Sequence, residues 1–113
     1  MTTKKTFAQD GAKEYLNLEE GRALVQLARR AIVTHLEENR ILRTPQEAPE
    51  KLRRKSGVFV TLNTVRPAHE LRGCIGFPYP TESLANATIK SAIYAATEDP
   101  RCPPVTLAEF RRS

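Results

Sequence analysis

Apolar residues recur at steps of three and four positions in the first half of the chain. Seven of them form one stripe, namely Ala23, Leu24, Leu27, Ala28, Ala31, Ile32 and Leu36. This spacing is typical of an amphipathic helix. Asn17 lies three residues before Glu20, which is the spacing of an N-terminal capping box. We therefore predict a helix from residue 17 to Asn39 or Arg40, preceded by a polar leader over residues 1–16.

A short run rich in β-branched residues follows at 57–64 and predicts a strand, and residues 70–77 predict a second strand. Residues 65–68 supply a turn between them. The prolines and dense charge of residues 43–56 are typical of a linker. A helix rich in small residues is predicted over about 82–97, and Thr106 with Glu109 marks the cap of a third helix. The pattern indicates an α+β domain over residues 17–113.

The two strands predict a hairpin whose register is set by its apolar residues. Placing Leu62 opposite Leu71 and Val58 opposite Ile75 buries one face. The other face then pairs three sets of residues, namely Phe59 with Cys74, Thr61 with Arg72, and Asn63 with Glu70. Cys74 and Arg72 would lie roughly 7 Å apart on this face.

Cys74 and Arg72 form the candidate site with the most specific chemistry. A guanidinium close to a thiol favours the reactive thiolate form. Gly73 and Gly76 remove bulk beside them, so a ligand or another backbone segment can approach closely. We interpret the pair as catalytic residues at a binding cleft lined by Phe59, Thr61, Glu70, Gly73 and Gly76. The alternative is that Cys74 is a small buried hydrophobic residue and the glycines permit strand packing.

Three further polar features of the chain could take part in function. Asp99 and Arg101 lie in a proline-rich loop, where Asp99 could pair with Arg101 or reach Arg72, and such loops often carry function. His69 falls at the turn, where a solvated histidine is the simpler interpretation. The basic run Arg53, Arg54 and Lys55 could meet phosphates weakly, or it could be a solvated linker.

Composition limits the functional classes. The 113 residues suit one domain, and 40% of them are hydrophobic. No apolar run approaches the ~20 residues of a membrane helix, and no signal peptide is recognisable, so a cytoplasmic location is expected. Two cysteines and two histidines cannot supply a structural zinc site at tight spacing. A net charge of +5 indicates no more than weak attraction to polyanions.

The string Leu71-Arg72-Gly73-Cys74-Ile75-Gly76 resembles the hallmark of the AMMECR domain family, named after the Alport-syndrome and elliptocytosis chromosomal region. The strand at 57–62 and the loop at 99–106 are similar to the segments on either side of that hallmark. The resemblance covers about residues 18–110. Cys102 departs from it, because the family usually has an aromatic residue at this position.

The resemblance implies an antiparallel sheet flanked by helices, arranged as two subdomains with a cleft, of which this chain is the N-terminal part. The family residues carried over to the cleft are Arg72, Gly73, Cys74, Gly76, Asp99 and Arg101. The family's activity is not established, and its relatives are encoded beside Memo-type and radical SAM proteins. Three functions therefore compete: a small-molecule-binding or accessory domain acting with those partners, a regulatory or protein-interaction module, and a weak nucleic-acid binder. Whether the chain is an enzyme, its cofactor and its oligomeric state stay open.

Overall fold

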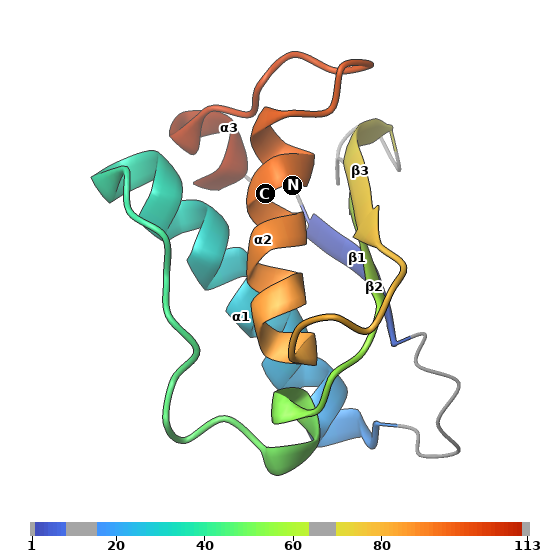
Figure 1. The fold of residues 1–113 in the computed structure, drawn as a ribbon. Helices are drawn as coiled ribbons and strands as arrows, with labels where there is room; N and C mark the ends of the chain where they lie inside the picture. The colour runs from blue at the N-terminus through green and yellow to red at the C-terminus, as the bar shows by residue number, and fades with distance from the viewer. Residues whose placement is uncertain (1, 9–15, 64–69, 112–113) are drawn as a thin grey trace.

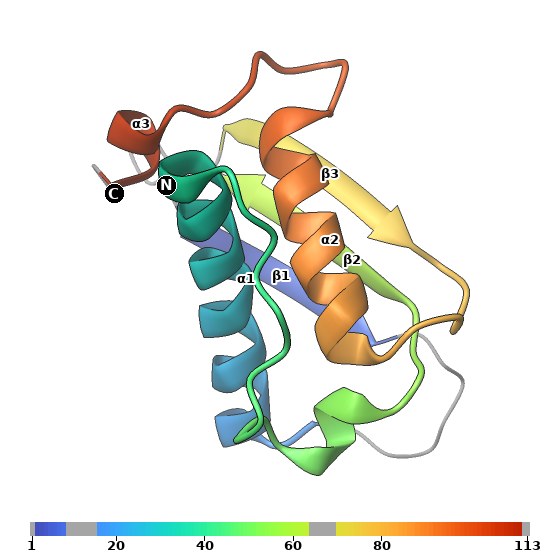
Figure 2. The ribbon, with the colours of Figure 1, turned by 60° about the vertical axis from the view of Figure 1, so that its left-hand side comes forward.

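A three-stranded antiparallel sheet in the order β1-β2-β3 forms one layer of the molecule, and two helices form the other (Figure 1). The computed structural model describes residues 2–8, 16–63 and 70–111. The elements are β1 (Thr2–Ala8), α1 (Leu18–Glu38), the 3₁₀ helix η1 (Glu50–Arg53), β2 (Val58–Asn63), β3 (Leu71–Phe77), α2 (Leu84–Thr97) and α3 (Leu107–Arg111). Figures 1 and 2 show α1 and α2 covering the same face of the sheet. The predicted α+β class is confirmed.

Helix α1 begins and ends where its local sequence predicts. The Asn17 side chain accepts a hydrogen bond from the backbone N–H of Glu20, and the Glu20 carboxylate accepts one from the N–H of Asn17, both at 2.8 Å. The last helical residue is Glu38, and the C-cap residue, Asn39, adopts the left-handed conformation at φ 53°. Asparagine tolerates that conformation because its short side chain can bond locally. The face turned to the core consists of Leu24, Leu27, Ala28, Ala31 and Ile32.

Helix α2 is buried along most of its surface because it packs on β2 and β3 and, at its side, on α1. Ser83 caps its first turn by accepting from the N–H of Asn86 at 3.1 Å. The helix starts at Leu84, two residues after the predicted start. Its small side chains permit close approach to β3, and Gly73 and Ala95 meet backbone to backbone there.

The hairpin of β2 and β3 keeps the predicted faces but not the predicted register. Val58, Val60 and Leu62 are buried toward the helices. Thr61 lies opposite Cys74 and Phe59 opposite Gly76, a shift of two residues from the prediction. The shift preserves the burial pattern because side chains alternate with a period of two.

Two segments differ from the sequence prediction. Residues 2–8 form β1, paired antiparallel with β2, and not a loose leader. Residues 43–56 pack against the domain, since Leu52 of η1 is buried and the N–H of Leu84 in α2 donates to the carbonyl of Arg54 at 2.7 Å. Within the segment, the Arg53 guanidinium donates to the carbonyls of Pro45 and Gln46 at 2.7 and 2.6 Å. The predicted turn at 65–68 lies outside the described residues. None of the described helices combines the length and apolar character that crossing a membrane requires.

Candidate functional site

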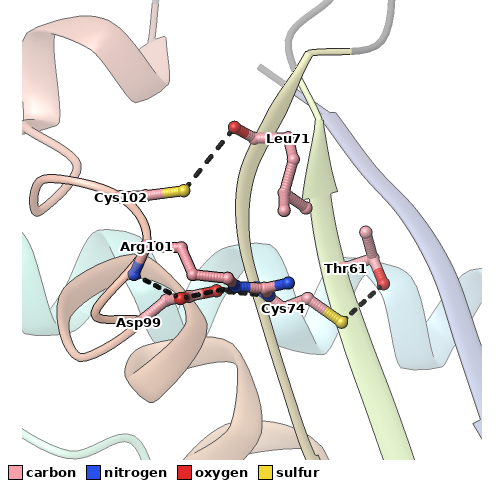
Figure 3. Close-up of polar contacts among 6 residues, drawn as sticks. All are labelled: Thr61, Leu71, Cys74, Asp99, Arg101 and Cys102. Atoms are coloured by element: carbon pink, nitrogen blue, oxygen red, sulfur yellow. Dashed lines mark hydrogen bonds and ion pairs between the residues drawn. The ribbon is translucent and has the colours of Figure 1, made fainter.

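The loop after α2 covers part of the free edge of β3. β3 pairs with β2 along one edge, so backbone groups on its other edge need partners from elsewhere. The N–H of Cys74 donates to Asp99 Oδ2 at 2.9 Å, and the thiol of Cys102 contacts the carbonyl oxygen of Leu71 at 3.7 Å (Figure 3). The loop is anchored in turn to α2, because the N–H of Val105 donates to the carbonyl of Ala96 at 2.7 Å. The hallmark strand and residues 99–105 therefore form one unit.

Asp99 is the centre of this unit. Its side chain is only 2% exposed, yet it is surrounded by donors. Oδ1 accepts from the backbone N–H and Nε of Arg101 at 2.9 and 3.1 Å, and Oδ2 accepts from Nη2 of Arg101 at 2.8 Å. These bonds, with that from Cys74, hold the pKa of Asp99 well below its usual range and outweigh the opposing effect of burial. Asp99 is therefore a carboxylate at neutral pH.

The thiol of Cys74 lies on the outer face of the sheet, which we define as the face opposite α1 and α2. It contacts the Thr61 hydroxyl at 3.3 Å (Figure 3). The guanidinium of Arg101 extends from Asp99 toward Cys74, and its pKa is raised mainly by its bonds to Asp99, with smaller contributions from Cys74 and Cys102. Its side chain is 60% exposed, so it has room to bind a solute. A hydroxyl, a thiol and a guanidinium thus meet at one place.

The Arg72 guanidinium does not lie with the side chains of Cys74 and Arg101. It is the residue of β3 that lacks a Cα partner at the register shift between Leu62 and Asn63, and an extra residue interrupts the alternation of faces. Its guanidinium binds the Glu109 carboxylate of α3 through Nε at 2.5 Å and Nη2 at 2.8 Å, and Nη1 contacts the carbonyl of Pro103 at 3.4 Å. The predicted pairing of Arg72 with Cys74 is corrected: the guanidinium beside Cys74 is that of Arg101.

The two glycines of the hallmark fit tightly against their neighbours. A Cβ on Gly73 would lie 1.8 Å from the carbonyl oxygen of Ala95, so the backbone of α2 fills the space that the prediction left for a ligand. A Cβ on Gly76 would lie 2.0 Å from the ring of Phe59, which covers the outer face there. Both glycines therefore serve packing, which is the alternative that the sequence left open.

The remaining predicted residues are placed as follows. Glu70 is exposed immediately before β3 and does not lie opposite Asn63, which pairs with Leu71. His69 lies outside the described residues. Sequence reasoning missed two participants, Glu109 and Cys102. The sequence predicts a capping box of Thr106 and Glu109, and the N–H of Glu109 does donate to the Thr106 hydroxyl at 3.1 Å, but the Glu109 carboxylate binds Arg72.

Metal ligands do not gather in the described part of the chain, where no group of three histidine, cysteine or acidic side chains could hold an ion. Both cysteines are free thiols. Arg53, Arg54 and Lys55 are exposed, as a weak polyanion-binding surface would require. The donor-rich surroundings of Cys74 suit an anion better than a cation.

Comparison with known proteins agrees with the family resemblance of the string at residues 71–76. The sequence model of the AMMECR1 family matches residues 25–113. A protein of Thermofilum pendens is 52% identical over 102 residues, which cover 84% of this chain and 48% of the relative. A Pyrococcus furiosus protein is 56% identical over 92 residues, which cover 80% of this chain and 44% of the relative.

A solved structure agrees as well. The crystal structure of the uncharacterised protein PH0010 from Pyrococcus horikoshii superposes with a TM-score of 0.78 at 50% identity, covering 83% of this chain and 47% of that one. The chain thus spans less than half the length of these relatives. The extent of the match and the level of identity establish that the chain belongs to the AMMECR1 family.

Proposed function

We propose that the chain is part of a cytoplasmic small-molecule-binding or accessory domain, which holds an anionic ligand beside Cys74 and acts with Memo-type and radical SAM partners. In this proposal Arg101 binds the anion, Thr61 and Cys74 contact it, and Asp99 orients Arg101. The partners are those that the resemblance to the family implies.

One observation carries the proposal: the buried carboxylate of Asp99 binds the backbone of Cys74 and the guanidinium of Arg101 together. A surface arginine ordinarily loses conformational entropy when it binds a ligand. Here Asp99 fixes Nε and Nη2 in advance, while Nη1 has no hydrogen-bond partner among the described residues. The guanidinium is thereby preorganised to hold an anion close to the thiol.

The test compares two site variants with a matched control. Cys74→Ser and Arg101→Gln are assayed with purified Memo-type and radical SAM partners, and both partner binding and partner-dependent turnover are measured. Arg40→Gln removes the same charge from an exposed arginine that pairs with Glu38, outside the site.

We expect the site variants to lose turnover at least about tenfold while binding is retained, as for the loss of one charged contact. The control should retain both. Loss of partner binding would favour the protein-interaction module instead. Unchanged turnover in both site variants, or no association of the unmodified chain with either partner, would refute the accessory role.

A further inference from the structure

A second concentration of hydrogen-bond donors lies at the opposite end of α2 from Asp99. The 14 residues of α2 span about 21 Å, so the two places are well separated. The segment that follows α1 runs along α2 toward its first turn (Figure 2), and the hydroxyl of Thr44 donates to the side-chain oxygen of Asn86 at 3.1 Å. A hollow of about 480 Å³ opens there, lined by Ile41, Leu42, Arg43, Thr44, Arg53, Ser83, Asn86 and Lys90. Its size is in the range of small-molecule sites.

Side-chain hydrogen-bond donors are left over around this hollow. The side-chain oxygen of Asn86 accepts from Thr44, which leaves the two amide N–H groups of Asn86 available. Arg53 uses Nη2 for two backbone carbonyls and retains its other N–H groups. Ser83 accepts from the N–H of Asn86, so its hydroxyl proton can still be donated. Ser83 therefore already caps the first turn of α2, and the free donors at this hollow belong to side chains.

Charge favours an anion in the same hollow. Three basic residues, Arg43, Arg53 and Lys90, line it. The Lys90 ammonium binds the carboxylate of Glu82 at 2.6 Å, and this bond raises the pKa of Lys90, so the ammonium stays charged. Arg43 is exposed and has no ion-pair partner among the described residues. Three cations against one carboxylate leave an excess of positive charge at this place.

We propose that this hollow binds the phosphate group of a small phosphorylated molecule. Arg43 supplies the principal charge, Lys90 and Arg53 supply further donors, and Asn86 completes the hydrogen bonding. A phosphate offers acceptors only, which is what a donor-rich site requires. Ile41, a lining residue that is 63% exposed, would contact the apolar part of the ligand. This site is independent of the one beside Cys74.

The experiment titrates the chain with two probes, inorganic pyrophosphate and ADP, by isothermal titration calorimetry at low ionic strength. Arg43→Gln should weaken the binding of both probes about tenfold, the effect of one charge-assisted contact. Arg40→Gln changes the net charge equally, but Arg40 does not line the hollow and its guanidinium is paired with Glu38. It should weaken binding less than about twofold, because its exposed charge is paired and screened by solvent. Ile41→Ser should weaken the binding of ADP and leave the binding of pyrophosphate unchanged.

Three results would overturn the proposal. Equal weakening by Arg43→Gln and Arg40→Gln would show attraction to net charge without a site. The absence of binding by either probe at millimolar concentration would show that the hollow takes no phosphate. Binding of single-stranded RNA that is sensitive to Arg43→Gln, without binding of ADP, would replace a small ligand by a nucleic acid.

Discussion

Replacing Gly73 by alanine tests the central contact of the fold, where β3 meets α2. A Cβ at this position would lie 1.8 Å from the carbonyl oxygen of Ala95 and 2.7 Å from its carbonyl carbon. Carbon and oxygen approach to about 3.3 Å at closest, so the helix would have to withdraw by about 1.5 Å. The obstacle is backbone and cannot rotate away, and α2 is packed on β2 and α1 as well.

The expected loss of stability follows from the known effect of overpacking a core. We expect Gly73→Ala to lower the free energy of unfolding by about 3 kcal/mol, the upper part of the usual range for overpacking. For a domain of this size that corresponds to a fall in Tm of roughly 10–20 °C. Thermal and urea unfolding followed by circular dichroism would measure both quantities.

Two other glycines provide matched controls for the same substitution. Gly21 lies inside α1 with nothing within 4 Å of an added Cβ, so Gly21→Ala should stabilise the protein by about 0.5–1 kcal/mol. At Gly76 the obstacle is the half-buried ring of Phe59, which can change rotamer, so Gly76→Ala should cost about 1 kcal/mol. A Gly73→Ala variant no less stable than Gly76→Ala would refute the contact between β3 and the backbone of α2.

Three further outcomes are expected. The pKa of Asp99 is lowered by its bonds to Arg101, so the carboxylate contributes its full stabilisation above about pH 4 and loses it as the pH falls further. Asp99→Asn should therefore lower the free energy of unfolding by about 1–2 kcal/mol at pH 7. The same variant should show a weaker dependence of urea unfolding on pH below about 4. A double-mutant cycle of Arg72→Ala and Glu109→Ala should give a coupling energy of about 1 kcal/mol, since the pair is bidentate but partly exposed, and a coupling near zero would contradict it. Asn17→Ala should lower the free energy of unfolding by about 1 kcal/mol in urea, and an unchanged midpoint would argue against the capping box.

Local chemistry explains why the helix boundaries could be predicted from the sequence. The capping box of Asn17 and Glu20 and the left-handed turn at Asn39 involve residues at most four positions apart. The same holds for Thr106, which caps α3 by accepting from the N–H of Glu109. Such signals act within a single turn of helix, so no distant partner is needed to interpret them.

Non-local pairing explains what the sequence analysis missed. The sequence of β1 has few apolar residues to mark a strand, and pairing with β2 makes it one. A hairpin shifted by two residues buries the same faces, so the apolar pattern does not distinguish one register from the other.

The sequence by itself determined the α+β class and the capped ends of α1, and its resemblance to the family grouped Cys74, Asp99 and Arg101 in one motif set. Only the tertiary structure decided which arginine lies beside the thiol. The irregular register at Arg72 and the carboxylate of Glu109, 37 residues further along the chain, draw its guanidinium to α3, while Asp99 holds Arg101 near Cys74. Charge pairing depends on distance in space, and sequence separation carries no information about that distance until the chain has folded.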